Sequence, residues 1–189
     1  MEHIVRPMER GDWGEIVEIF FQGIQSNNST FHYECPSYEE WDAIHTKDCR
    51  LVIEDGDEVV GFAALTPFSS RECYKGVASV SIYIDGDHQH GGYGTELLSA
   101  LVAESEKCGY WTLEASIFET NAPSIKLHEK CGFRVVGVRE RLGKDRFGVW
   151  RSVVLMERRI QTDKAGGCDC AQMKKAQAEQ AEREKHMMD

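Results

Sequence analysis

Apolar residues recur at helical spacing in four segments of the chain, and each segment predicts a helix with one buried face. These segments are residues 13–24, the stretch after Ser37 that carries Trp41 and Ile44, residues 92–107 and residues 122–130. The first two begin with a polar residue followed three positions later by glutamate, namely Asp12 with Glu15 and Ser37 with Glu40. That spacing predicts that each pair caps its helix.

Other segments alternate apolar and polar residues or are rich in β-branched residues, which predicts strands. They are residues 3–7, 51–54, 58–66, 78–85, 112–117, 133–139 and 149–157. Asp55-Gly56-Asp57 joins two of them and is typical of a tight hairpin turn. Because strands alternate with helices but hairpins occur at both ends, the sequence predicts an α/β fold with a twisted mixed sheet and helices on both faces.

Composition divides the chain into a globular part, residues 1–160, and a polar, charged tail, residues 161–189. The tail has almost no large apolar residue apart from three methionines, so a solvated helix or disorder is expected there. A chain of 189 residues with 41% hydrophobic content fits one domain with a short appendage.

Charge and composition exclude several classes of partner. The net charge of −10 argues against a nucleic acid, which needs a basic surface. There is no run of 18 apolar residues and no secretory signal, so no membrane partner is expected. Seven irregularly spaced cysteines favour reduced thiols in the cytoplasm. Cys168-x-Cys170 lacks the second pair that would close a tetrahedral site, so no metal is expected.

The chemistry is carried by a strand, a glycine-rich loop and a helix start between Ser81 and Thr95. Free backbone N–H groups and the helix dipole form an anion site at such a helix start. Gly92 and Gly94 would let a diphosphate approach the backbone. The loop lacks the Gly-Lys-Ser/Thr of a P-loop and the full dinucleotide glycine pattern. Taken alone, the glycines are equally compatible with a tight turn that binds nothing.

Two motifs resemble the GNAT superfamily of N-acetyltransferases. Gln89-x-x-Gly92-x-Gly94 matches its Q/R-x-x-G-x-G/A signature, and residues 121–133 resemble its second signature. Pro67-Phe68-x-x-Arg71-x-x-Tyr74 and several other segments resemble phosphinothricin and methionine sulfone or sulfoximine N-acetyltransferases in particular. The similarity runs from about residue 4 to residue 158, and it implies the GNAT acyl-CoA N-acyltransferase fold.

The resemblance implies acetyl-CoA as cosubstrate. The backbone of Ile82, Tyr83 and Ile84 would pair with the pantetheine amides, although these are also ordinary strand residues. Asn121 and Ser124 would contact the pantetheine arm, and Asn121 also suits a helix N-cap. The loop that would hold the diphosphate consists of Gln89, His90, Gly91, Gly92, Tyr93, Gly94 and Thr95.

The resemblance also implies roles around the substrate. Arg71 would grip a substrate carboxylate, since a guanidinium binds it bidentately. Phe31, Tyr74 and Ser81 would line the substrate pocket. His128 takes the place of a tyrosine that protonates the thiolate in many superfamily members, and imidazole can do so near neutral pH.

One position departs from the subfamily, which carries a glutamate base where this chain has Ser79. A serine hydroxyl is too weak an acid to replace that base, though it can hold a water molecule. The sequence leaves Glu34, Glu72, His128 or a chain of water molecules as replacements. Ser79 is therefore a candidate catalytic position with an altered role.

The sequence as a whole predicts an N-acetyltransferase that moves an acetyl group to the amino group of a small amino-acid-like molecule. Two alternatives remain: an acetyltransferase for another amine, such as a polyamine or a protein N-terminus, and a non-catalytic acyl-CoA-binding module. The resemblance also implies a homodimer, with the final strands as contact edges.

Overall fold

The computed structural model describes residues 3–89 and 91–160. His90, the predicted tail 161–189 and the Cys168-x-Cys170 pair lie outside the described residues. Within the described part, no helix is long and apolar enough to cross a membrane.

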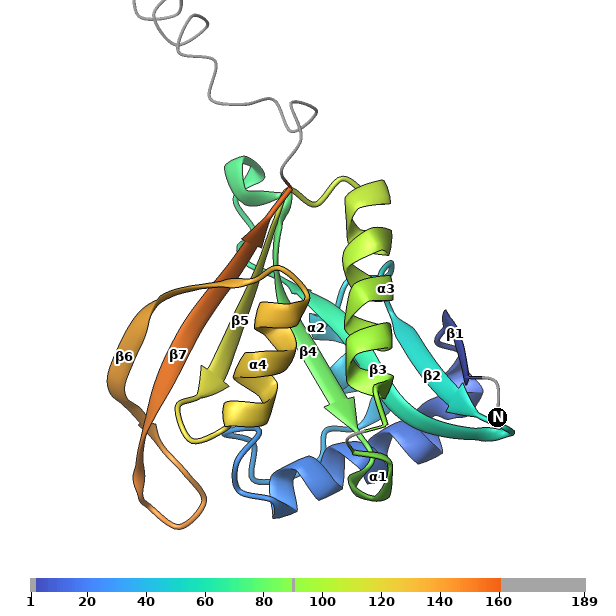
Figure 1. Ribbon diagram of the computed structural model, residues 1–189, viewed down its shortest axis with the longest axis horizontal. Coiled ribbons are helices and arrows are strands. Elements are labelled where there is room, and N and C mark those ends of the chain that lie inside the picture. The colour runs from blue at the N-terminus through green and yellow to red at the C-terminus, as the bar shows by residue number, and fades with distance from the viewer. Residues whose placement is uncertain (1–2, 90, 161–189) are drawn as a thin grey trace, which may run out of the picture. The chain divides into compact units, whose positions relative to one another are not determined.

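A seven-stranded mixed sheet in the order β1-β2-β3-β4-β5-β7-β6 forms the centre of the fold (Figure 1). Its strands are β1 (His3–Pro7), β2 (Leu51–Asp55), β3 (Glu58–Pro67), β4 (Val77–Ile84), β5 (Thr112–Phe118), β6 (Arg134–Lys144) and β7 (Trp150–Arg159). Among these strands β4 and β5 pair in parallel, and all other neighbours are antiparallel. The predicted mixed sheet is confirmed.

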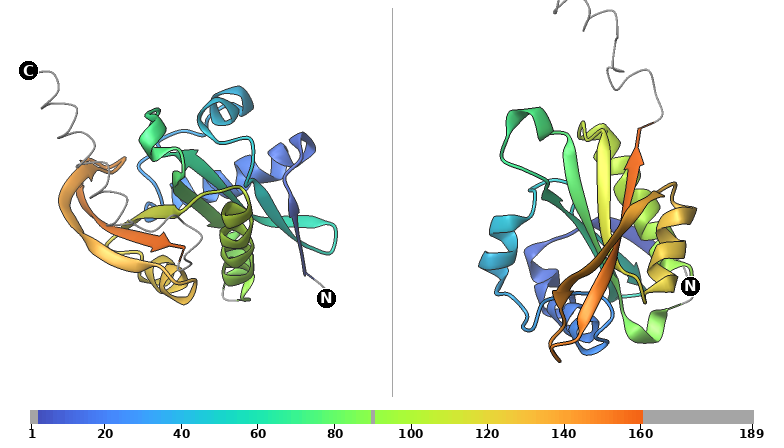
Figure 2. Two further views of the ribbon diagram at one scale, coloured as in Figure 1. Left: turned by 90° about the horizontal axis from the view of Figure 1, so that it is seen from above. Right: turned by 90° about the vertical axis from the view of Figure 1, so that its left-hand side faces the viewer.

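Helices cover both faces of this sheet, as expected (Figure 2). One face carries α1 (Trp13–Gln25) and α2 (Tyr38–Ile44), and the other carries α3 (Tyr93–Lys107) and α4 (Ala122–Lys130). Three short 3-10 turns, η1 (Arg10–Asp12), η2 (Glu72–Tyr74) and η3 (Gly86–His88), lie in the connections.

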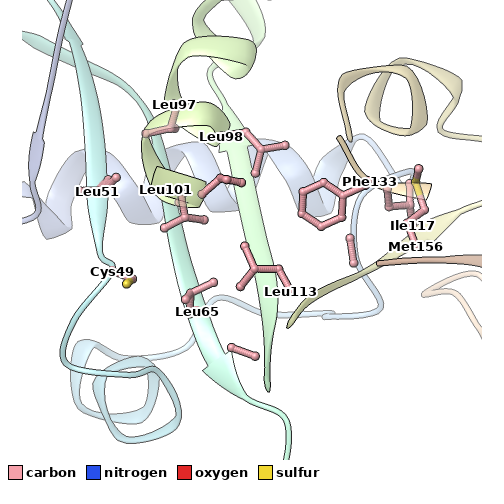
Figure 3. Packing of buried hydrophobic residues seen from close by; sticks show 14 of the residues in the cluster. Cys49, Leu51, Leu65, Leu97, Leu98, Leu101, Leu113, Ile117, Phe133 and Met156 are labelled. Carbon is pink, nitrogen blue, oxygen red and sulfur yellow. The ribbon is translucent and has the colours of Figure 1, made fainter. Parts of the chain in front are cut away.

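The larger core lies between α3 and the sheet (Figure 3). Leu97, Leu98 and Leu101 of α3 are fully buried there against sheet residues such as Leu65 and Leu113. Burial of one such side chain stabilises a fold by about 1.5–3 kcal/mol. Every second residue of β4 and β5 belongs to this core. Because successive strand residues face opposite sides of a sheet, the residues between them point to the face that carries α1 and α2.

The two predicted caps have different outcomes. Ser37 Oγ accepts from the Glu40 backbone N–H at 3.3 Å and Glu40 accepts from Ser37 N–H at 2.8 Å, which confirms the second cap. The first was wrong, because Asp12 instead binds Arg6 Nη1 at 2.8 Å and the Glu9 N–H at 2.7 Å. An ion pair brought in from β1 therefore replaces the local cap.

Asp145 stabilises the turn between β6 and β7. Its carboxylate is buried and accepts hydrogen bonds from Asn27 Nδ2 at 2.9 Å, Arg151 Nε at 2.8 Å, and the backbone N–H groups of Phe147 and Val149 at 2.9 and 3.0 Å. Burial alone would raise the pKa of Asp145, but these hydrogen bonds together lower it to about 2. The side chain thus joins this hairpin to the end of α1.

Replacement of Asp145 by asparagine should destabilise the fold at neutral pH, because an amide cannot accept all four hydrogen bonds. An unfolded aspartate has a pKa of about 3.9, and the folded value is lower, so the carboxylate stabilises the fold above about pH 4. This contribution is lost as the pH falls from about 4 towards 2. Urea unfolding of wild type and Asp145→Asn at pH 7, 4 and 2.5 should show a difference that narrows with acid. Asp57→Asn, on an exposed turn, is the control. A pH-independent difference would contradict the prediction.

Candidate functional site

A cleft opens where β4 and β5 separate. Residues 77–79 of β4 pair with residues 112–114 of β5. Beyond these residues the two strands diverge (Figure 1). The diverging arms form walls of a cleft of about 1460 Å³, to which both strands contribute. On the edge of β4 that faces β5, residues 80–84 have no strand partner within the described part of the chain. This edge therefore offers backbone N–H and C=O groups to a ligand.

The N-terminus of α3 lies at this cleft. Its N-cap is Gly92, with a φ of 91°, and no side chain caps the helix. The first backbone N–H groups are thus left for solvent or an anion, at the positive end of the helix dipole. Gly94 also lies at the cleft, and a Cβ there would come within 3.1 Å of Leu127 Cδ2. The positive φ at Gly92 and the close approach of Leu127 to Gly94 both favour glycine.

The loop before α3 is held in place by its own hydrogen bonds. Asp85 accepts from Gln22 Nε2 at 2.7 Å, from the Asp87 N–H at 2.9 Å, and lies 2.9 Å from His88 Nδ1. Gln22 Oε1 accepts from the Gly86 N–H at 2.8 Å. Helix α1 therefore fixes the path of the chain into the helix start.

The predicted cofactor residues of β4 line the cleft, but their side chains are part of the cores. Tyr83 is stacked on Phe62 with ring centroids 5.3 Å apart, and burial raises the pKa of Tyr83 to about 12. Ile82 and Ile84 pack against the core below α3. Their interpretation as strand residues is thus confirmed. Pairing of the β4 edge with pantetheine amides stays a prediction.

Asn121 is the N-cap of α4, as the sequence predicted, while its contact with a pantetheine arm stays a prediction. Its Oδ1 accepts from the Ser124 N–H at 3.2 Å and caps α4, while its Nδ2 donates to the Asn28 carbonyl at 2.9 Å. Both Asn121 and Ser124 line the cleft. The cap orients the first turn of α4 towards the cleft.

His128 is buried on α4 and lines the cleft. Its Nδ1 lies 2.8 Å from the Ser124 carbonyl oxygen, an arrangement that requires Nδ1–H as donor and leaves Nε2 unprotonated in the neutral ring. Burial lowers the pKa of His128, and the hydrogen bond to Ser124 opposes this only in part. The lowered pKa favours the neutral ring, whose Nε2 is able to accept a proton.

The structure brings together most of the predicted site residues. The cleft wall includes Phe31, Ser79, Ser81, Ile82, Tyr83, Ile84, Gln89, Gly92, Tyr93, Gly94, Thr95, Asn121, Ser124 and His128. Gly91 is exposed beside the wall, and His90 is outside the described residues.

Two predicted substrate residues do not reach the wall. Arg71 and Tyr74 lie exposed around η2, with the guanidinium 5.8 Å from the Tyr74 ring centroid. Tyr74 also packs edge-to-face on Phe68, at 5.2 Å. Their assignment therefore stays a prediction.

Sequence reasoning missed two cations of the cleft, Lys126 and Lys130. Both project from α4, four residues apart, and Glu40 is the acidic residue of the described wall. Their spacing alone could have placed them on one face of the helix, but not at the cleft. The wall is thus suited to an anion although the chain is acidic.

Outside the cleft, Asp48, Cys49 and Cys108 bring their ligand atoms within 4.8 Å of one another. Cys49 is buried, and burial raises the pKa of its thiol, with Cys108 adding to the effect. A thiol must lose its proton to bind a metal, so this raised pKa opposes metal binding at the group.

The chain is similar in sequence and structure to known acetyltransferases. The acetyltransferase (GNAT) family model matches residues 13–133. The L-methionine sulfoximine/L-methionine sulfone acetyltransferase of Salmonella typhimurium is 33% identical over 119 residues, 63% of this chain and 68% of that protein. The phosphinothricin N-acetyltransferase of Streptomyces viridochromogenes is 27% identical over 158 residues, 82% of this chain and 86% of that protein. A phosphinothricin acetyltransferase of Sinorhizobium meliloti, crystallised with acetyl-CoA, superposes with a TM-score of 0.77 at 27% identity, over 85% of this chain and 89% of that one.

The anion site at α3 can be tested with Gly92→Val. A branched side chain at this φ of 91° is strained, and its Cβ would occupy open space at the cleft. We expect at least a tenfold loss of affinity for acetyl-CoA, about 1.4 kcal/mol, measured by calorimetry. Gly109→Val is the matched control, because Gly109 follows the same helix with a φ of 89° and equally open space. It should lose similar stability but keep its affinity. Equal affinities in both variants would argue against an anion site here.

Proposed function

Because the chain belongs to the GNAT family of acetyltransferases, we propose that it transfers an acetyl group from acetyl-CoA to the amino group of a small amino-acid-like molecule of the phosphinothricin or methionine sulfone type. The observation that carries this proposal is the cleft between β4 and β5, which joins an uncapped helix N-terminus to a strand edge. The substrate class is supported by the names of the relatives in Salmonella and Streptomyces. The cytoplasm, which supplies acetyl-CoA, is the proposed location.

The residues present fit acetyl-CoA. The α3 N-terminus and the lysines of α4 suit its phosphates, and the free edge of β4 and the Asn121 amide suit the amides of its pantetheine arm. When bound, acetyl-CoA would supply a thioester already activated for acyl transfer. The chain's own residues must then position the amine and manage its protons.

An amine attacks only after it loses its proton. An alkyl ammonium with a pKa of about 10.4 is neutral in about one molecule in a few thousand at pH 7. After attack, the nitrogen carries a positive charge and loses a second proton as the C–S bond breaks. We propose that the neutral His128 takes up this proton at Nε2 and passes it to the departing sulfur. This order agrees with a ring that begins unprotonated.

Phe31 and Ser81 are the proposed walls of the amine pocket. Phe31 packs edge-to-face on Phe118, with ring centroids 4.6 Å apart, and Gly143 allows this ring to come close to the β6–β7 hairpin. Arg71 remains the proposed partner of a substrate carboxylate. It would have to act from the η2 loop, outside the cleft wall described above.

The substrate class can be tested by measuring thiol release from acetyl-CoA with a panel of amines. We expect the highest kcat/KM with phosphinothricin, methionine sulfone or a related amino acid. A preference for a polyamine or a peptide N-terminus would overturn the substrate class but keep the acetyltransferase. Binding of acetyl-CoA without turnover of any amine would point to a binding module instead.

The variant Arg71→Ala tests whether Arg71 binds the carboxylate of the substrate. If Arg71 holds a carboxylate, the variant should raise KM for the acid by roughly tenfold to a hundredfold, since a charge-assisted hydrogen bond contributes about 1.5–3 kcal/mol. The substrate's carboxamide is the matched control and should change little. Equal effects on both substrates would remove Arg71 from the proposal.

We also propose that β6 pairs with a second copy of the chain. It is an edge strand on which Val135, Val136 and Val138 are 46%, 45% and 48% exposed, and an apolar free edge is normally covered. Light scattering should give about twice the mass of one 21.4 kDa chain. Val138→Lys should shift that mass towards the monomer. Ile4→Lys, on the opposite edge strand, should not. A monomeric wild type would contradict the proposal.

A further inference from the structure

Ser79 and Glu114 form the last pair before β4 and β5 diverge. Residues opposite each other on neighbouring strands lie about 5 Å apart. The residues on either side of Glu114, Leu113 and Ala115, belong to the core below α3, as does Ala78. The side chains of Ser79 and Glu114 therefore share the other face of the sheet. Ser79 is part of the cleft wall, and Glu114 lies next to it, outside that wall.

Glu114 has no obvious structural task. Its side chain is half-buried, and no hydrogen bond or ion pair to its carboxylate is found within the described part of the chain. The charged groups that act on it are Arg139 of β6 and Glu157 of β7, and Glu157 is itself paired with Arg134. Across β4 the neighbour of Ser79 is Thr66 of β3, which is neutral. The carboxylate is thus left to solvent or to a ligand.

Other candidate bases are placed less well. Glu34 is exposed, and Glu72 is exposed and bound to Lys75 at 2.5 Å. Neither is a strand neighbour of Ser79. His128 belongs to α4, on the opposite side of the sheet from Ser79 and Glu114. Among the described residues, Glu114 is the one whose carboxylate is paired across the sheet with Ser79.

We propose that Glu114 is the general base that removes the first proton from the substrate ammonium, through one water molecule held by the Ser79 hydroxyl. This inference rests on the acetyltransferase function proposed above. The N–H bond of the ammonium breaks, its electron pair stays on nitrogen, and the proton forms an O–H bond on Glu114. The neutral amine then forms the N–C bond to the acetyl carbon. After the product leaves, Glu114 returns its proton to solvent.

The electrostatics agree with this role. Burial raises the pKa of Glu114; Arg139 lowers it in part, and Glu157 raises it further. A carboxylate with a raised pKa accepts a proton from an ammonium more readily than an ordinary one.

The test is a pH profile of kcat/KM, measured for wild type and Glu114→Gln with whichever amine reacts best. Wild type should be nearly flat from neutral pH up to the amine pKa, because Glu114 can deprotonate the ammonium. In Glu114→Gln only free amine should react, so the rate should rise about tenfold for each pH unit. The loss at pH 7 should be about a hundredfold or more, and it should shrink as the pH approaches the amine pKa. Affinity for acetyl-CoA should be unchanged.

Three variants separate this role from a structural one. Glu114→Asp keeps a carboxylate and should retain the flat profile at a lower rate. Ser79→Glu combined with Glu114→Gln moves the carboxylate to the neighbouring strand and should restore part of the activity at pH 7. Glu157→Gln removes the same charge one strand further from the cleft and should keep the rate at pH 7.

A Glu114→Gln profile parallel to wild type, or one with no loss at pH 7, would overturn the proposal. So would a failure of Glu114→Asp to retain the flat profile. Because the assay uses the best amine found, a different substrate class would leave this test intact. An absence of turnover in wild type would instead contradict the proposed acetyltransferase function.

Discussion

The separation of β4 and β5 is the constraint on which the site depends. Each strand has one full antiparallel partner, β3 for β4 and β7 for β5, but the two share only three paired residues on each strand. The unpaired backbone that results would be costly if it were buried without a partner. In this fold it lines a cleft instead, where solvent or a ligand can satisfy it. The cleft is thus a consequence of the pairing itself.

Two cores keep the arms apart and rigid. Below α3, Leu97, Leu98 and Leu101 bury one face of the sheet, and behind it Ile16, Phe20 and Phe62 bury the other with Tyr83. Since Ile82, Tyr83 and Ile84 pack their side chains into these two cores, that part of β4 offers a ligand its backbone edge. A site built on such strands is more rigid than one built on loops. The amide Asn121 adds to this rigidity by joining α4 to the segment that follows α1.

The site also reconciles an acidic chain with an anionic cosubstrate. A net charge of −10 would repel phosphates at long range. At the cleft, however, the helix dipole, free backbone N–H groups, Lys126 and Lys130 act at short range, where they outweigh distant, screened charges. Net charge therefore indicates poorly what this local site can bind.

The sequence by itself determined the elements and the glycine-rich loop before α3, because both depend on residues close together in the chain. Hydrophobic spacing predicted the helices and strands, and the Gln89-x-x-Gly92-x-Gly94 motif predicted an anion site at the start of α3. Tertiary structure alone decided which distant residues meet. The Asp12 cap gave way to an ion pair with Arg6, Arg71 lies outside the cleft wall, and Lys126 reaches it. Glu114 lies 35 residues from Ser79 in sequence, and only the register of a parallel pair places them side by side. Such a register depends on packing between helices and sheet, for which no local pattern of residues contains the information.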